Sequence, residues 1–235
     1  MNLLKLSRVY DRWAAEDPFR AACTERDAWT EQEFFAYGIR HIDGVMTAAE
    51  KLRPVPRGAA LDFGCGPGRL VNALAKHFPR VIGVDVSQQM IETARRLQQN
   101  PACTFVLNQA PDLRQFESGT FDFVHTCKVL QHIRPDLSVQ YIGEFMRLLT
   151  PGGMAVFQVP ERPKGVVGGL VLLWAPARLL RVLRRIDMYG LNESTVRAAV
   201  ERAGGTVLRR EPCDDAGPRW EDWRYFAVRN PTKAG

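Results

Sequence analysis

The chain has 235 residues and a mass of 26.5 kDa, a length that suits one large domain with a single core. With 46% apolar and 25% charged residues, its composition excludes a mainly disordered chain, because disorder needs low hydrophobicity and high net charge. The net charge of +6 suits nucleic acid, an anionic membrane or an acidic substrate, so charge alone selects none of these partners.

Five cysteines are scattered through the chain; their number is odd and no CxxC pair occurs. This pattern argues against a disulfide framework or a zinc knuckle and predicts reduced thiols in a cytoplasmic protein. Charged residues such as Lys5 and Arg8 interrupt the N-terminus, which therefore lacks the apolar core of a signal peptide. The longest apolar run, 165–177, contains Pro176 and is too short to span a bilayer.

Residues 1–57 form the first zone and are predicted to be a helical cap. Apolar residues between Phe34 and Met46 recur at helical spacing, and the zone as a whole predicts two or three amphipathic helices. The segment 54–58, with the sequence PVPRG, predicts the end of this zone and a linker.

Residues 58–160 change to an alternation of short apolar strands and helices. The strands are predicted over 59–63, 81–86, 103–107, 121–127 and 154–159. The helices between them are predicted over 69–78, 87–97 and 137–149. This order predicts βαβ units and therefore a doubly wound α/β fold, with a mostly parallel sheet and helices on both faces.

Residues 161–235 are less regular and begin with an apolar and basic insertion at about 161–190. Pro176 starts a short basic amphipathic helix, whose arginines are Arg178, Arg181, Arg184 and Arg185. Three interpretations stay open: a lid packed on the domain or on a second subunit, a lid over an apolar or lipid-like acceptor, and weak peripheral membrane contact. A helix over 193–203 and strands over 206–210 and 223–229 follow; the two strands are predicted to pair antiparallel at the sheet edge.

A glycine loop joins the first strand to its helix, with glycines at 64, 66 and 68. Such a loop allows positive φ angles and presents backbone N–H groups to a ligand. Its spacing is GxGxG, with Arg69 where a dinucleotide fold requires its third glycine, so a pyrophosphate cradle is disfavoured. Asp85 ends the second strand 21 residues after Gly64, and a carboxylate there can accept both hydroxyls of a ribose.

Four segments in this order resemble the motifs of the class I S-adenosylmethionine-dependent methyltransferases: LDFGCGPGR, VIGVDVS, FDFVHTCKVLQHI and LLTPGGMAVFQVP. The resemblance covers about residues 58–160. It implies a Rossmann-like, seven-stranded sheet with an antiparallel last strand, built from residues 58–235 behind the cap. It also implies S-adenosylmethionine as cofactor and S-adenosylhomocysteine as product.

The resemblance assigns cofactor contacts position by position. The residues matched to the methionine moiety are Asp62, Gly64, Gly66 and Gly68, with Cys65 between them as a small residue without a redox task. Asp85 matches the ribose ligand.

Other matched positions surround the adenine and the cofactor's amino group. Val86 is expected to pack on the adenine. Gln109 stands where the family usually has an acid at the adenine amino group, and its carbonyl oxygen can accept the same hydrogen bond. Ala110 offers its backbone N–H to the ring, and the backbone around Cys127 matches the segment near the amino group.

Two aromatic residues of the cap, Tyr10 and Trp13, are expected to approach the cofactor through cation–π or stacking contacts, or else to pack the cap onto the sheet. His132 is the candidate general base, because it lies just beyond the fourth strand at the carboxyl edge of the sheet. A scaffold role for His132 is the alternative, and His125 is expected to be a core residue. No His, Asp or Glu cluster has metal-ligand spacing, so no catalytic metal is predicted.

The predicted function is methylation of a small molecule, preferably at oxygen, with an apolar or anionic metabolite as acceptor. An RNA or other macromolecule methyltransferase is one alternative, and a non-catalytic S-adenosylmethionine-binding protein is another. The base-methylating motif Asn/Asp-Pro-Pro-aromatic is absent, because 126–128 reads Thr-Cys-Lys, which makes nucleic acid an unfavourable substrate. A monomer and a homodimer are both compatible with the sequence.

Overall fold

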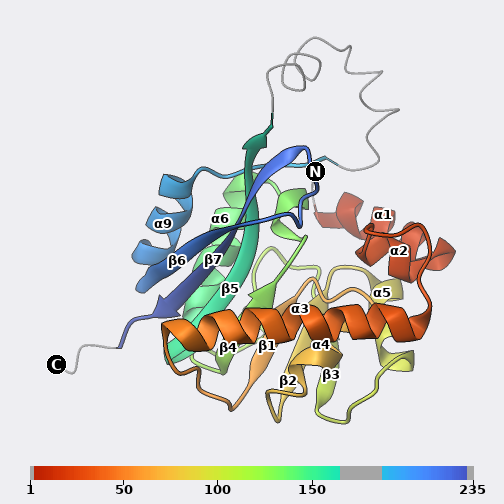
Figure 1. Cartoon of the computed structure of the whole chain (residues 1–235), viewed down its shortest axis with the longest axis horizontal. Helices are drawn as coiled ribbons and strands as arrows, with labels where there is room; N and C mark the ends of the chain where they lie inside the picture. The colour runs from red at the N-terminus through yellow and green to blue at the C-terminus, as the bar shows by residue number, and fades with distance from the viewer. Residues whose placement is uncertain (1–2, 165–186, 232–235) are drawn as a thin grey trace.

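The computed structural model describes residues 3–164 and 187–231, which fold around one seven-stranded mixed sheet (Figure 1). The strands are β1 (Ala60–Phe63), β2 (Val81–Asp85), β3 (Cys103–Leu107), β4 (Phe121–Thr126), β5 (Leu149–Pro163), β6 (Gly205–Cys213) and β7 (Trp220–Arg229). Their order in the sheet is β3-β2-β1-β4-β5-β7-β6.

Strands β1 to β5 pair in parallel, whereas β7 pairs antiparallel with both β5 and β6. This confirms the predicted mostly parallel, Rossmann-like sheet with an antiparallel last strand and an antiparallel pair at its edge. Because β7 is antiparallel to both of its neighbours, β6 runs in the same direction as β1–β5. The residues after β6 therefore lie at the same edge of the sheet as the residues after β1.

Helices cover both faces of the sheet, as the βαβ alternation predicts. One face packs against α3 (Glu31–Leu52), α4 (Arg69–Leu74) and α5 (Gln88–Arg96). The other packs against α6 (Pro135–Leu148) and α9 (Glu193–Arg202). Neighbouring residues of one strand enter different cores: Phe123 packs with the α3 layer and Val124 with the α6 layer.

The N-terminal zone contains the predicted helices, in two different positions. α1 (Leu3–Glu16) and α2 (Pro18–Ala22) lie beyond α5 at one end of the sheet, whereas α3 packs along a face (Figure 1). A capping box starts α3, because Thr30 accepts the backbone N–H of Glu33 and the Glu33 carboxylate accepts that of Thr30. Of the predicted cap, only α1 and α2 therefore lie apart from the two faces of the sheet.

Several predicted boundaries were wrong, among them the end of α4 and both ends of β5. α4 ends at Leu74 rather than 78, because residues 75–78 form tight turns. Pro79 follows these turns, and a proline disfavours the helical conformation in the residue before it. β5 begins at Leu149 rather than 154, since Leu149 already pairs with Phe121 before Gly152 turns the chain at a φ of 85°.

The basic helix predicted after Pro176, with its lid and membrane interpretations, lies outside the described residues. A short 3₁₀ turn, η1 (Leu130–His132), follows β4 and was not predicted. Within residues 3–164 and 187–231, no helix combines the length and hydropathy needed to cross a membrane.

Candidate active site

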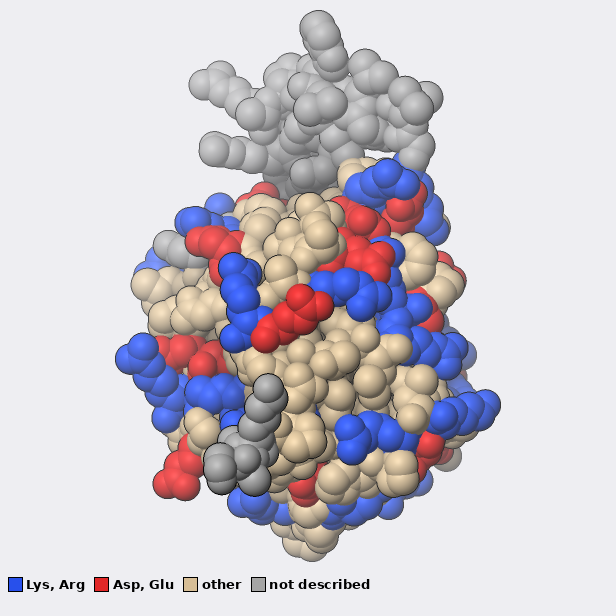
Figure 2. Space-filling view, turned by 90° about the vertical axis from the view of Figure 1, so that its left-hand side faces the viewer, with Lys and Arg blue, Asp and Glu red and all other residues tan. Residues whose placement is uncertain are grey.

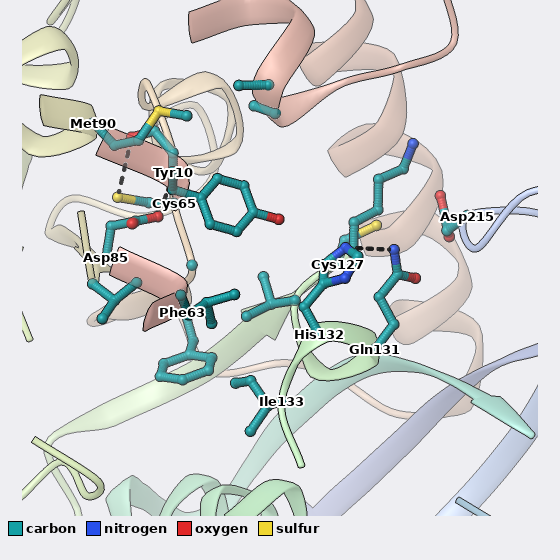
Figure 3. A pocket seen from close by; sticks show the side chains of 18 of the residues that line it. Tyr10, Phe63, Cys65, Asp85, Met90, Cys127, Gln131, His132, Ile133 and Asp215 are labelled. Atoms are coloured by element: carbon teal, nitrogen blue, oxygen red, sulfur yellow. Dashed lines mark hydrogen bonds between the residues drawn. The ribbon is translucent and has the colours of Figure 1, made fainter. Parts of the chain in front are cut away.

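A cavity of about 560 Å³ lies at the carboxyl ends of the parallel strands (Figure 3). Its walls come from α1, the β1–α4 glycine loop, the end of β2, the residues after β4 and the β6–β7 loop. This is the edge where open α/β sheets bind ligands, and the volume lies in the range of small-molecule sites. The β6–β7 loop takes part because β6 ends at this edge.

The glycine loop has the backbone conformation that its sequence predicts. Gly64, Gly66 and Gly68 have φ angles of 76°, 51° and 87°. A Cβ atom on Gly64 would lie 2.2 Å from Val129 Cγ2, so only glycine fits there. Gly64 and Gly66 line the cavity, as does Cys65 between them, and their backbone can closely approach a ligand.

Asp85 lies at the end of β2 and faces the same cavity. Its two carboxylate oxygens accept the backbone N–H groups of Gly66 and Ser87, each at 2.9 Å. Burial raises the pKa of Asp85 to about 6, although these hydrogen bonds act in the opposite direction. Each oxygen keeps a lone pair, so the carboxylate can still accept two hydroxyl groups. Val86 follows it in the wall.

Helix α1 closes the cavity and is tied to α5. Asp11 accepts a hydrogen bond from the Ser87 hydroxyl at 2.6 Å and one from the Gln89 backbone N–H at 3.2 Å. Tyr10 and Trp13 line the cavity with their ring centroids 5.7 Å apart. Burial raises the pKa of Tyr10 above its usual value, and the nearby charge of Asp85 adds to this, so the phenol stays protonated.

Four of the expected cofactor residues do not line the cavity. Asp62 is buried beneath the loop, where one carboxylate oxygen pairs with His125 Nδ1 at 2.9 Å. Gly68 caps α4. The Gln109 amide donates toward Ser7 Oγ and the Val86 carbonyl, and the Ala110 carbonyl accepts from Tyr141.

His132 lines the cavity opposite Asp85, with its ring 6.3 Å from that of Tyr10 (Figure 3). Burial lowers the pKa of His132 to about 4, so the imidazole is neutral near pH 7. Its Nδ1 is 3.3 Å from the Asp187 carbonyl, which requires the proton to be on Nδ1. The remaining lone pair on Nε2 then accepts the Gln131 amide at 3.1 Å.

A chain of hydrogen bonds fixes this orientation of Gln131. The Gln158 amide donates to Asp222 at 2.6 Å and to the Gln131 carbonyl at 3.2 Å, while its own carbonyl accepts the Lys128 backbone N–H at 2.9 Å. With its carbonyl engaged, Gln131 can present only its N–H group to His132. The chain from the buried Asp222 carboxylate and the Asp187 carbonyl therefore favour the same tautomer of His132.

Lys128 occupies an unusual backbone position directly after β4. It is the one non-glycine residue with a positive φ, 64°, among residues 3–164 and 187–231. Its ammonium group pairs with Glu25, which comes from the turn between α2 and α3 and also lines the cavity. Cys127 precedes it in the wall, and burial raises the pKa of the Cys127 thiol well above its usual value.

Several lining residues were not predicted. Asn108 and Asp215 follow the ends of β3 and β6, so a strand-end signal was available for both. The sequence does not indicate Asp215 as a lining residue, because it does not show that β6 runs parallel to β1. Glu25 and Met188 reach the cavity only through the tertiary fold, and no local pattern indicates them.

Comparisons with known proteins identify the family. A family profile described as a methyltransferase domain matches residues 60–153. The chain is 30% identical over 162 residues to an uncharacterized methyltransferase of Synechocystis, a match that covers 68% of this chain and 73% of that protein. It is 33% identical over 104 residues to the ubiquinone biosynthesis O-methyltransferase of Vibrio parahaemolyticus, covering 43% of each. The chain spans about half the length or less of most other curated relatives that it matches.

A solved structure agrees with the fold over nearly the whole chain. The magnesium protoporphyrin IX methyltransferase of Synechocystis, crystallised with S-adenosylhomocysteine, superposes with a TM-score of 0.68 and 20% identity. The superposition covers 97% of this chain and 99% of that one. Sequence, profile and fold agree with the resemblance carried by the four motifs: the chain belongs to the class I S-adenosylmethionine-dependent methyltransferases.

Proposed function

We propose that this chain transfers a methyl group from S-adenosylmethionine to a hydroxyl oxygen of a small, largely apolar metabolite. The observation that carries the proposal is the shared cavity, which has Asp85 and the glycine loop at one end and His132 at the other. S-adenosylmethionine, when bound, supplies a sulfonium methyl group for in-line displacement. The two ends of one cavity are suited to orient this methyl group and its acceptor, and orientation accounts for much of such a rate.

The residues present fit the cofactor. Asp85 has free lone pairs for the ribose hydroxyls, and Gly64 and Gly66 leave room where any Cβ atom would be strained. Met90 and Val86 provide apolar surface for the adenine. Four expected cofactor residues lie outside the cavity wall: Asp62, Gly68, Gln109 and Ala110. We further propose that they support the cofactor site indirectly, by holding the residues of the wall in position.

An apolar acceptor fits the wall better than an anionic one. The apolar residues of the cavity wall include Trp13, Val129 and Ile133. Among the described residues, four acidic side chains line the cavity, namely Glu25, Asp85, Asp214 and Asp215, and only two cationic ones, Arg69 and Lys128. Lys128 is paired with Glu25, so the charge of the wall disfavours a carboxylate or phosphate. The Vibrio parahaemolyticus relative is an O-methyltransferase, which supports oxygen as the acceptor atom.

We propose that His132 accepts the proton of the acceptor hydroxyl. Its neutral imidazole has a lone pair on Nε2, and the hydroxyl would replace the Gln131 N–H at that atom. A hydroxyl must lose its proton when its oxygen becomes methylated, so a base at this end of the cavity would accept that proton.

We also propose a cytoplasmic location for this chain. The five cysteines are all free, which supports that location.

The experiment is a transfer assay with tritiated-methyl S-adenosylmethionine against phenols, apolar alcohols, hydroxy acids, amines and transfer RNA. Transfer to a phenol or an apolar alcohol, with the label recovered in an ether linkage, is the expected result. Labelling of amines alone would contradict the proposed oxygen acceptor. Labelling of RNA alone would replace the small-molecule proposal by the macromolecule alternative.

A further inference from the structure

Three side chains that can bind a metal ion converge at the wall of the cavity, away from Asp85. They are His41 of α3, Cys127 after β4 and Asp215 of the β6–β7 loop. A ring nitrogen of His41, the Cys127 Sγ and a carboxylate oxygen of Asp215 all lie within 4.8 Å of one another. Cys127 and Asp215 also line the cavity, and Figure 3 shows them on the side opposite Asp85.

His41 has a polar atom that the described residues leave without a partner. Its Nε2 is buried and makes no hydrogen bond in that part of the chain. Buried polar atoms are nearly always satisfied, so an unpaired nitrogen on an imidazole that lies beside a thiol and a carboxylate points to a missing ligand.

The charges around the three side chains are compatible with a divalent cation. Three cations lie near: Arg224 pairs with one oxygen of Asp215 at 3.1 Å, Lys128 pairs with Glu25, and the guanidinium of Arg69 packs over the rings of Phe34 and Tyr37. The thiolate and the carboxylate bring two negative charges to the site, and Asp215 shares its charge with Arg224. The bond from Arg224 also fixes the Asp215 carboxylate, as hydrogen bonds to metal ligands commonly do.

We propose that His41, Cys127 and Asp215 bind one zinc ion, with its fourth coordination position open to the cavity. One nitrogen, one sulfur and one oxygen donor form a set that Zn²⁺ accepts in tetrahedral geometry. Bonds of about 2.0–2.3 Å place tetrahedral ligand atoms roughly 3.3–3.8 Å apart, so the side chains close in by about 1 Å on binding. The Cys127 thiol releases its proton to solvent, and no redox change occurs.

The site was not evident in the sequence because its three residues are 86 and 88 positions apart and belong to three different elements. An open position on Zn²⁺ can take an oxygen donor from a molecule in the cavity and lower the pKa of a bound hydroxyl. This consequence for the acceptor rests on the proposed function; binding of the metal ion does not.

The test titrates Zn²⁺, and Co²⁺ as its spectroscopic substitute, into the whole chelator-treated and dialysed chain without cofactor or acceptor. We expect one equivalent of Zn²⁺ by calorimetry and a thiolate-to-cobalt charge-transfer absorption. His41→Ala, Cys127→Ser and Asp215→Asn should each weaken Zn²⁺ binding at least tenfold, and Cys127→Ser should abolish the absorption.

Two matched controls keep the assignment specific. His77→Ala removes a histidine that lies outside the cavity and pairs with Asp43, and it should bind Zn²⁺ as the unchanged chain does. Cys213→Ser removes the thiol of a second group around Asp215, with Asp222, and should also have no effect.

Three results would overturn the proposal: no stoichiometric binding of either ion, wild-type affinity in both His41→Ala and Cys127→Ser, or loss of binding in Cys213→Ser alone. S-adenosylhomocysteine binding, measured on the same variants, reports separately on folding and on the cofactor end. Loss of Zn²⁺ affinity with retained S-adenosylhomocysteine binding is the pattern expected of the three ligand variants. A failed metal site therefore remains distinguishable from a failed cofactor site.

Discussion

Asp85 connects the glycine loop, helix α5 and the cavity through one carboxylate. Gly66 and Ser87 donate to its two oxygens, and Ser87 in turn donates to Asp11 of α1. Burial disfavours the charged form of this carboxylate and so raises its pKa. A ribose that donates two hydroxyl hydrogen bonds to the carboxylate has the opposite effect, because it favours the charged form. Cofactor binding and ionisation of Asp85 should therefore be linked.

The affinity for S-adenosylhomocysteine should depend on pH below neutrality. The pKa of Asp85 is raised to about 6, so the carboxylate is charged at pH 7 to 8 and takes up a proton as the pH falls toward 5. Since the protonated form is the weaker acceptor, the dissociation constant should be flat above pH 7 and rise by up to about tenfold per pH unit below 6. Calorimetric titration from pH 5 to 8 measures it. A flat profile in the unchanged chain would show that Asp85 is not the linked group.

His132 should give a different pH signature in catalysis. Its pKa is lowered to about 4, so turnover that depends on the neutral imidazole should fall only below about pH 5, rather than near 6.5. If His132 is the base, His132→Ala should lower kcat on the order of 10²–10⁴-fold. The S-adenosylhomocysteine affinity should stay within twofold. Near-full turnover of His132→Ala would assign His132 a scaffold role.

At the scale of single residues, local motifs identified some of the side chains at strand ends, such as Asp85, but not Asn108 or Asp215. Asp85 and the loop glycines were predicted because their roles depend on backbone geometry within a few residues. Asp62 was expected in the cavity wall, but it pairs with His125 on the neighbouring strand. That contact depends on the register of β1 and β4, which the sequence does not display.

At the scale of elements, the backbone conformation of the β1–α4 loop shapes the cofactor end of the cavity. Gly64 has a φ of 76° and no space for a Cβ atom next to Val129. Gly44, in the middle of α3, has nothing within 4 Å of its Cβ position, although it is also a glycine in a packed element. The two positions therefore form a matched pair for testing the loop.

Gly64→Ala should lower the unfolding free energy by about 1–3 kcal/mol and weaken cofactor binding more than tenfold. Gly44→Ala should instead raise the unfolding free energy by roughly 0.5–1 kcal/mol, because alanine is favoured over glycine inside a helix. Urea denaturation gives the free energies and calorimetry the affinities. Equal behaviour of the two variants would mean that the loop conformation is not required.

The link between α1 and α5 should control cofactor release. Asp11→Ala removes the acceptor for the Ser87 hydroxyl and the Gln89 N–H, so α1 should open more readily and S-adenosylhomocysteine should dissociate about tenfold faster. Stopped-flow displacement measures the rate. Glu16→Ala, at the exposed end of the same helix, is the control and should leave it unchanged. If both variants release the ligand at the wild-type rate, α1 does not gate the cavity.

Element order was predictable because strand and helix periodicities differ clearly over 58–160. Boundaries were less so: tight turns shorten α4 before Pro79, and pairing with Phe121 extends β5 toward α6. The position of α3 on a sheet face, apart from α1 and α2, follows from long-range packing of Ile42 and Met46. No composition shift within 1–57 marks that division.

At the scale of the whole molecule, the basic balance does not form a single-sign surface on the face that Figure 2 shows. Lys and Arg side chains alternate there with Asp and Glu. Several arginines of the β6–α9 side are paired, among them Arg210 with Glu161 and Glu193, and Arg197 with Glu193. A nucleic-acid-binding surface requires clustered positive charge, so the charge pattern of this face does not support a nucleic-acid substrate.

The glycine spacing and Asp85 together distinguish an S-adenosylmethionine site from a dinucleotide site, and calorimetric titration tests this directly. S-adenosylhomocysteine should bind the purified chain with one-to-one stoichiometry, whereas NADH should not bind. Asp85→Asn should weaken S-adenosylhomocysteine binding by about 10- to 150-fold, since each hydrogen bond to a charged group contributes about 1.5–3 kcal/mol. The exposed Asp43→Asn should bind as the unchanged chain does. Binding of NADH without S-adenosylhomocysteine, or an unaltered affinity in Asp85→Asn, would contradict the account.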